Sequence, residues 1–319
     1  MFLFIYLFIS GYVFYLCNKF NTETYINKLK NRFRTLFMPY IIWNSIAIVL
    51  VLIKNLPVFN SFLTYDGTEI DLSISNIMSC FWMYDGKLSS PPPEVANYAD
   101  FIQKTAYPIN TALWFLRDLM FVVVCSPILY ILIKKLRKYA LIILGSLYLF
   151  SIFNNDNYHF TQLMTVFFFF SWGGYMSIYG VDMIVEFKKY FLIFLLLFLL
   201  SFIFLIECED GIVYIIFKQL NIFATLILAY NISARLIEAN IVKVNKMLAS
   251  SSFFIYVSHC LITARLTKVM AMLVSPQNDV ELCLVYLISF VVTIILLLSI
   301  YKLMSKYVPS VLRLMIGRK

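Results

Sequence analysis

Four cations stand close together in the segment KLKNRFRTLFMPYIIWN, residues 28–44. They are Lys28, Lys30, Arg32 and Arg34, and an apolar run to about residue 56 follows them. Lys and Arg side chains bind phosphate groups, and Arg does so with two parallel hydrogen bonds. Cations beside a membrane-spanning helix also hold that helix end on the cytoplasmic side and attract anionic lipid headgroups. The cluster is therefore either a topology anchor or a site for a phosphate-rich ligand.

Ionisable side chains inside apolar runs are costly, and each one marks a candidate site. His259, in SFFIYVSHCLI, is the only histidine inside such a run. It lies about eight residues, or ~12 Å, from the cytoplasmic end of that run, and Ser10 and Gly11 lie ~10 Å deep in the first run. An imidazole at this depth either acts as a general base for a hydroxyl group or forms a structural hydrogen bond to a neighbouring helix.

Two adjacent charged residues, Arg117 and Asp118, follow Trp114 at the start of a further apolar run, LWFLRDLM. Adjacent residues project about 100° apart on a helix, so these two side chains do not pair ideally. We expect each to meet a partner on another helix or to line a polar cavity, with a structural ion pair as the alternative. Arg265, in the outer half of the His259 run, requires an anion or carbonyl groups as partners.

The composition indicates which elements position these side chains. The chain is 62% hydrophobic and 13% charged, whereas soluble proteins carry about 25% charged residues. It is therefore an integral membrane protein. Its Lys and Arg residues occur in short gaps between apolar runs, which excludes a nucleic-acid surface, because that requires basic residues on one solvated face. With only two histidines, a His-rich metal site is also excluded.

A bilayer core requires about 20 apolar residues per helix. At this width the sequence predicts nine spans, at residues 1–17, 35–56, 112–133, 139–154, 160–180, 190–206, 213–232, 251–273 and 281–304. Nineteen of the 26 Lys and Arg residues fall in alternate gaps, starting with residues 18–34, and only Lys87 and Lys104 fall in the other gaps. This alternation predicts an all-α polytopic membrane protein with a cytoplasmic C-terminus.

The remaining segments complete this topology. Residues 57–111 form its one long gap, and we expect an extracytoplasmic loop there, within a single membrane domain that covers residues 1–319. The basic and apolar residues 307–319 predict a short helix at the membrane surface. Because the first span ends in the cytoplasm, residue 1 would begin outside, and we expect one further helix upstream of it.

Six segments of the sequence are informative when they are taken together. FISGYVF, KNRFRTLFMPYIIWN, LWFLRDLM, FFFFSWGGYMS and SSFFIYVSHCL occur in this order, and PSVLRLMIGRK closes the chain. They resemble successive blocks of the membrane-bound acyltransferase 3 family. The resemblance implies a multi-pass enzyme of the bacterial cytoplasmic membrane. Such an enzyme moves an acetyl or succinyl group from cytoplasmic acyl-CoA, its co-substrate, to a sugar hydroxyl of a cell-envelope polysaccharide or glycolipid, without a bound cofactor.

The resemblance also implies site residues. The donor site falls on Lys30, Arg32 and Arg34, with the spacing RxR in place of the commoner RxxR. The family's first helix, with its Arg and catalytic His, has no counterpart in residues 1–319, so His259 is the remaining catalytic candidate. Positions with cavity or structural roles are Ser10, Gly11, Trp43, Trp114, Arg117, Asp118, Tyr256 and Arg265. Two other functions stay open: a transporter or flippase of lipid-linked sugars, and an inactive fragment.

Overall fold

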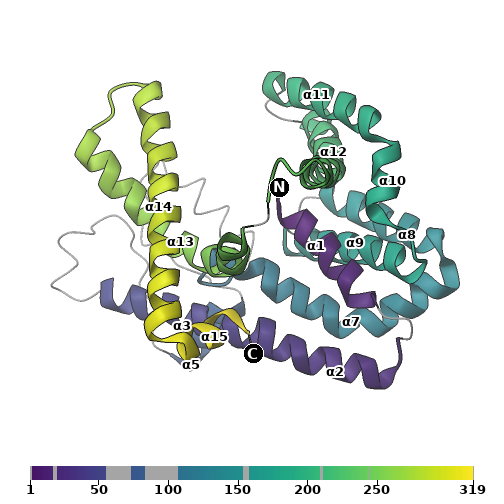
Figure 1. Ribbon diagram of the computed structural model, residues 1–319, viewed down its shortest axis with the longest axis horizontal. Coiled ribbons are helices and arrows are strands. Elements are labelled where there is room, and N and C mark those ends of the chain that lie inside the picture. The colour runs from purple at the N-terminus through teal and green to yellow at the C-terminus, as the bar shows by residue number, and fades with distance from the viewer. Residues whose placement is uncertain are drawn as a thin grey trace. The chain divides into compact units, whose positions relative to one another are not determined.

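The computed structural model describes residues 2–16, 20–54, 73–82, 107–153, 158–208, 211–243 and 245–318. Within these ranges the chain forms helices and no strand (Figure 1). Each apolar run predicted from the sequence coincides with a helix. These helices are α1 (Phe2–Tyr15), α3 (Met38–Lys54), α7 (Trp114–Leu136), α8 (Lys138–Phe153), α9 (Tyr158–Ile178), α11 (Phe191–Glu207), α12 (Gly211–Glu238), α13 (Lys246–Val274) and α14 (Asp279–Tyr307). The predicted all-α fold class is confirmed.

Fewer of these helices meet a strict test for crossing a membrane. Among the described residues, five helical stretches are long and apolar enough: Thr22–Ile53, Thr111–Leu136, Gly211–Glu238, Lys246–Val274 and Asp279–Tyr307. A sixth arises if α10 (Met183–Lys189) and α11, which are bent by 69° at their junction, count as one span. α1 and α8 have 14 and 16 residues, short of the ~20 that span a bilayer core. The protein is therefore a multi-pass membrane protein with five or six spans by this measure.

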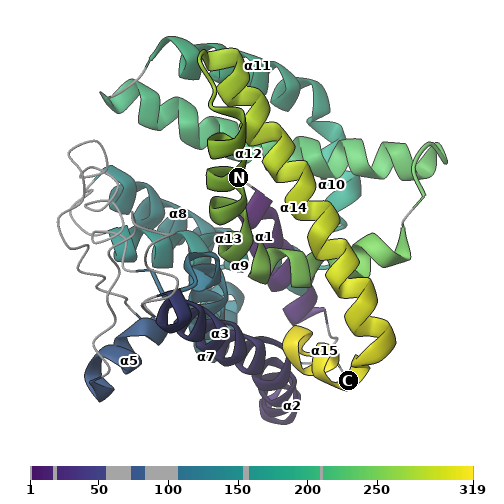
Figure 2. The ribbon, with the colours of Figure 1, turned by 90° about the vertical axis from the view of Figure 1, so that its left-hand side faces the viewer.

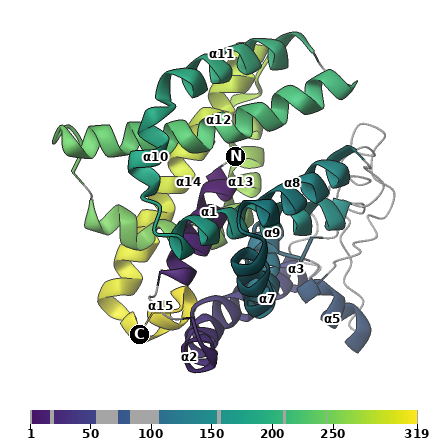
Figure 3. The ribbon, with the colours of Figure 1, turned by 90° about the vertical axis from the view of Figure 1, so that its right-hand side faces the viewer.

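The chain forms two compact units, each assembled from segments that are distant in sequence. Unit 1 contains residues 1–29 and 118–244, and unit 2 contains residues 30–117 and 245–319. In unit 1, α11 and α12 pack side by side (Figure 3). In unit 2, α13 and α14 pack side by side, and α15 (Pro309–Ile316) lies beside α3 (Figure 2).

Unit 1 is built on the close packing of α1 against α9. A Cβ atom at Gly11 would collide with the backbone of Phe170, and one at Gly173 would collide with the backbone of Phe8. Small residues let membrane helices approach this closely and gain dispersion energy along both backbones. The glycines of FISGYVF and SWGG therefore have a structural role, and Gly11 acts as a packing residue.

Two further contacts fix the ends of elements in unit 1. The N-terminus of α2 (Thr22–Arg32) is capped reciprocally, since the backbone N–H of Thr24 donates to Asn21 Oδ1 at 2.8 Å and that of Asn21 donates to Thr24 Oγ1 at 2.9 Å. The Lys28 ammonium donates to the Phe14 carbonyl and lies 5.0 Å from the Phe14 ring centroid. Lys28, one of the four clustered cations, is thus bound to α1.

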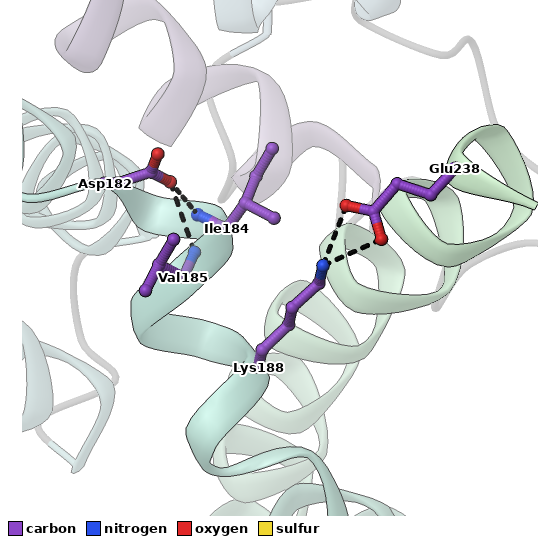
Figure 4. Close-up of polar contacts among 5 residues, drawn as sticks. All are labelled: Asp182, Ile184, Val185, Lys188 and Glu238. Atoms are coloured by element: carbon purple, nitrogen blue, oxygen red, sulfur yellow. Dashed lines mark hydrogen bonds and ion pairs between the residues drawn. The ribbon is translucent and has the colours of Figure 1, made fainter.

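α10, the helix that precedes the 69° bend, has a cap at its N-terminus and an ion pair near its C-terminus (Figure 4). The Asp182 carboxylate caps α10 by accepting from the backbone N–H groups of Ile184 and Val185, at 2.8 and 3.2 Å. Lys188 donates to both carboxylate oxygens of Glu238 on α12, at 2.7 and 2.8 Å. Both partners of this pair are solvated, so it contributes at most about 1 kcal/mol.

Unit 2 combines α3, α5 (Ile74–Trp82), η2 (Thr111–Leu113), α13, α14 and α15. α5 is a helix inside the predicted loop 57–111, and it is anchored because the Tyr40 hydroxyl of α3 donates to the Phe81 carbonyl. Residues 57–72 and 83–106 of that loop lie outside the described residues. The short helix predicted for residues 307–319 is confirmed as α15, which begins with Pro309, a residue suited to a first helical turn.

Candidate functional site

A cavity of about 850 Å³ lies in unit 2, between the C-terminal end of α2 with the turn that follows it and helix α15. Ligand pockets typically measure about 300–1,000 Å³. The lining residues are Lys30, Asn31, Phe33, Arg34, Met38, Ser310, Arg313, Leu314, Gly317 and Arg318. Four of these ten residues are cationic and none is acidic. The cavity is therefore suited to an anionic ligand.

Lys30 and Arg34 form one wall of this cavity. They stand four residues apart, which places two side chains on the same face of a helix. Arg32 lies between them, about 200° around the helix from Lys30 at ~100° per residue. It is half-buried and is not among the lining residues. Of the three residues that the sequence assigned to a donor site, the structure brings two to the cavity.

The helix changes its geometry at this wall. Residues Phe33–Phe37 form η1, a π-helix, and the Met38 N–H donates to the Phe33 carbonyl five residues earlier. π-Helical turns are rare and are frequent at functional sites. A π-helical turn contains more residues than an α-helical turn. It therefore rotates the face that carries the cations relative to the apolar face of α3, compared with one continuous α-helix.

Arg313, in the last turn of α15, and Arg318, just beyond the end of this helix, form the other wall. The Arg318 N–H donates to the Arg313 carbonyl at 2.9 Å, and the Gly317 N–H donates to the Leu314 carbonyl at 3.3 Å. These two bonds define a Schellman C-cap, which needs a left-handed residue at the position of Gly317, where φ is 67°. The chain reversal places both arginines at the same end of α15.

α15 is held by a hydrogen bond from α3 and by close packing against η1. The indole Nε1–H of Trp43 donates to the Met315 carbonyl at 3.0 Å, and the Trp43 ring packs edge-on against Phe254 of α13, with 5.5 Å between ring centroids. At Gly317, an added Cβ would lie 2.6 Å from the backbone of Thr35. Trp43, predicted to have a cavity or structural role, therefore supports the wall that carries Arg313 and Arg318.

The four cationic side chains that line the cavity are accessible to an anionic ligand. All four side chains are exposed, and within the part of the chain that the structure describes no carboxylate pairs with Lys30, Arg34, Arg313 or Arg318. Ion pairs are found elsewhere, as between Lys188 and Glu238. Four clustered charges that no carboxylate of the described residues neutralises attract anions and raise their local concentration.

A second group of polar side chains surrounds His259, also in unit 2. The His259 Nδ1 atom lies 2.6 Å from the Tyr256 carbonyl. A carbonyl oxygen only accepts, so Nδ1 carries a proton, and in the neutral imidazole Nε2 is the acceptor. The Cys260 thiol lies 3.3 Å from Nε2 and can donate to it in that form. In its neutral form His259 therefore directs its basic nitrogen toward the Cys260 thiol.

The helix of His259 is tied to the segment before α7 by buried hydrogen bonds. The Tyr256 hydroxyl donates to the Ala112 carbonyl. The Asn110 side-chain amide donates to the Val257 carbonyl at 2.9 Å, and its backbone N–H donates to Asn44 Oδ1 at 3.2 Å. The sequence does not predict roles for Asn44, Asn110 and Cys260. The residues around a single Asn or Cys do not indicate which distant residue it contacts in the folded protein.

The other predicted residues are dispersed. Arg117 is buried, donates to the Trp82 carbonyl at 2.6 Å, and lies 5.4 Å from the Trp82 ring centroid, so one of its partners is on α5. Trp114 is half-buried beside Phe115. Arg265 is exposed and donates to the Leu261 carbonyl of its own helix. Ser10, Gly11 and the buried Asp118 belong to unit 1.

The apolar helices define an integral membrane protein. The four-cation cavity is its candidate anion site, and the imidazole of His259, inside a membrane-spanning helix, is its candidate base. Comparison with known families matches residues 4–302 to the acyltransferase 3 family, described as an acyltransferase domain. The chain belongs to this family, as its sequence blocks predicted. No curated protein and no solved structure matches it.

Proposed function

We propose that the protein is an O-acyltransferase of the bacterial cytoplasmic membrane. It moves an acetyl or succinyl group from acyl-CoA to a sugar hydroxyl of a cell-envelope polysaccharide or glycolipid. Family membership supports acyl transfer. The observation that carries the donor assignment is the cavity with its four cations and no acid, because coenzyme A bears both a 3′-phosphate and a diphosphate.

The topology supports the same proposal. Lys30 and Arg34 lie in one predicted cytoplasmic gap, and Arg313 and Arg318 lie in another. These segments are almost the whole chain apart in sequence, yet they line one cavity. In a nine-span arrangement with a cytoplasmic C-terminus, the cavity opens to the compartment where acyl-CoA is made.

His259 is the proposed general base. Its Nε2 accepts the proton of the acceptor hydroxyl, which takes the place of the Cys260 thiol. The hydroxyl oxygen bonds to the thioester carbonyl carbon, the carbon–sulfur bond breaks, and coenzyme A leaves as a thiolate that recovers the proton. The Tyr256 carbonyl holds the imidazole in the tautomer that this step requires.

The test is transfer of radiolabelled acetyl from acetyl-CoA to envelope glycan, with the full chain in membranes. His259→Ala should lower the rate by about 10²–10⁴-fold, the usual contribution of a general base. His159→Ala, at the start of α9, is the control and should retain the rate. Movement of the glycan acceptor across the membrane without label would favour a flippase, and an equal rate in both variants would exclude His259 as the base.

A further inference from the structure

We propose that α15 supplies half of the donor site, so that Arg313 and Arg318 bind one phosphate group of the ligand while Lys30 and Arg34 bind another. The occupant is a nucleotide with phosphates at two separate positions, of the coenzyme A class. This inference rests on the proposed function only in taking the donor to be a coenzyme A thioester.

The first argument is the pairing of the cations. Each wall contributes two: one pair is four residues apart on a helix, and the other is brought together by the Schellman turn at Gly317. Arg313 lies in the last turn of α15 and Arg318 just beyond it, and the hydrogen bond from Trp43 to the Met315 carbonyl holds this helix on α3.

The second argument is charge balance. A phosphate monoester carries about −1.5 to −2 at pH 7, so one phosphate neutralises about two of the four lining cations. A ligand with a 3′-phosphate and a diphosphate carries roughly twice that charge and matches all four. The same ligand without its 3′-phosphate leaves one pair of cations without a partner. The cavity should therefore select for the 3′-phosphate.

The third argument is the apolar part of the lining. Phe33, Met38 and Leu314 face the same cavity as the cations. The Phe33 ring is more than half exposed and stacks on Phe37, with 4.8 Å between ring centroids. An exposed aromatic face beside cations suits a nucleotide base, because bases stack on aromatic side chains in a sequence-tolerant way.

The experiment measures binding of coenzyme A and of dephospho-coenzyme A by calorimetry, with the full chain in nanodiscs of neutral phosphatidylcholine. The variants are Arg313→Gln with Arg318→Gln, and Lys30→Gln with Arg34→Gln. The matched control is Lys302→Gln with Lys306→Gln, which removes two cations from exposed positions near the end of α14, outside the cavity.

Each cavity double variant should weaken coenzyme A binding at least tenfold, and the control should not. One cavity variant should also lose the preference for coenzyme A over the dephospho form, while the other keeps it. Because the exchanged side chains are exposed, all variants should elute as the unaltered chain does. If either cavity double variant elutes differently, its two single Gln variants replace it, and each should still weaken coenzyme A binding more than the control does.

Three results would overturn the proposal. The first is coenzyme A affinity in the α15 variant equal to that of the control. The second is equal displacement of coenzyme A by the same concentration of inorganic phosphate, which indicates a simple anion site. The third is cation-dependent binding of phosphatidylglycerol in place of coenzyme A, which indicates a lipid-headgroup site. If coenzyme A binds as expected but no acetyl group is transferred, the proposed function is wrong and this inference stands. If acetyl transfer does not depend on Arg313 and Arg318, this inference is wrong and the proposed function stands.

Discussion

At the scale of single residues, the Tyr256 carbonyl decides which nitrogen of His259 carries the proton. It leaves Nε2 facing Cys260, and a thiol beside a basic imidazole is also the arrangement of a cysteine nucleophile. The two chemistries differ in whether the acyl group ever resides on the protein. Cys260 therefore separates direct transfer from a two-step route.

Cys260→Ala should leave the acyl-transfer rate within a few fold, because direct transfer uses only the imidazole. The measurement is kcat for acetyl transfer, together with retention of label on the protein when no glycan is supplied. Cys283→Ala on α14 is the matched control, because this thiol is exposed. A loss as large as that of His259→Ala, with hydroxylamine-sensitive label on the unaltered protein, would make Cys260 the nucleophile.

Residue types could be read from the sequence more readily than their partners. Lys30 and Arg34 were recognised because a cationic cluster before an apolar run is a local pattern. Arg313 and Arg318 were recognised only as a basic tail, since their relation to Lys30 depends on how α15 packs against α3. Hydrogen bonds such as that from Asn110 to Val257 join residues far apart in sequence and leave no local pattern.

At the scale of elements, Gly317 sets the position of α15. Gly317→Ala should weaken coenzyme A binding several fold without any change of charge, because its Cβ would force α15 away from Thr35. A non-glycine residue in the left-handed region also costs about 1–2 kcal/mol of stability.

Gly180→Ala is the matched control for that variant. Gly180 has a φ of 64°, close to the 67° of Gly317, and nothing lies within 4 Å of an added Cβ. Both variants should lower the unfolding temperature through backbone strain, and only Gly317→Ala should affect calorimetric binding of coenzyme A. Equal binding in the two variants would show that α15 does not need its contact with Thr35.

The α1–α9 crossing is a second feature at this scale. Gly173→Ala should destabilise the protein in detergent by more than about 1 kcal/mol, because its Cβ would collide with the Phe8 backbone, and backbone cannot move aside as a side chain can. Gly145→Ala on α8 is the comparison, since its Cβ would meet only the Phe168 side chain. The measurement is the midpoint temperature of thermal unfolding of the two variants. Equal midpoint temperatures would contradict the close backbone contact at Gly173.

At the scale of the whole molecule, helices could be predicted from the sequence but their assembly could not. Apolar runs became helices because lipid leaves backbone groups no other partners. Their lengths were less certain, since α1 and α8 end short of a full bilayer crossing. The two units each join distant segments, and such contacts depend on side-chain fit between helices, as at Gly11 and Phe170.

From the distribution of Lys and Arg residues along the chain, we predict that the cavity opens on the cytoplasmic side of the membrane. In a chain whose six native cysteines are replaced, Ser310→Cys reports on the cavity lining and Gln277→Cys on the predicted extracytoplasmic gap between α13 and α14. An impermeant maleimide should label Gln277→Cys in intact cells. It should label Ser310→Cys only after the cells are opened, because positively charged gaps stay in the cytoplasm.

Coenzyme A adds a second readout to this labelling. If its phosphates occupy the cavity, it should slow the labelling of Ser310→Cys in opened membranes and leave Gln277→Cys unaffected. Tyr307→Cys, exposed at the end of α14 and outside the cavity lining, is the control on the same side. Labelling of Ser310→Cys in intact cells would place the cavity outside. Acyl-CoA in the cytoplasm could not then reach the four cations, and both the nine-span topology and the donor assignment would fail together.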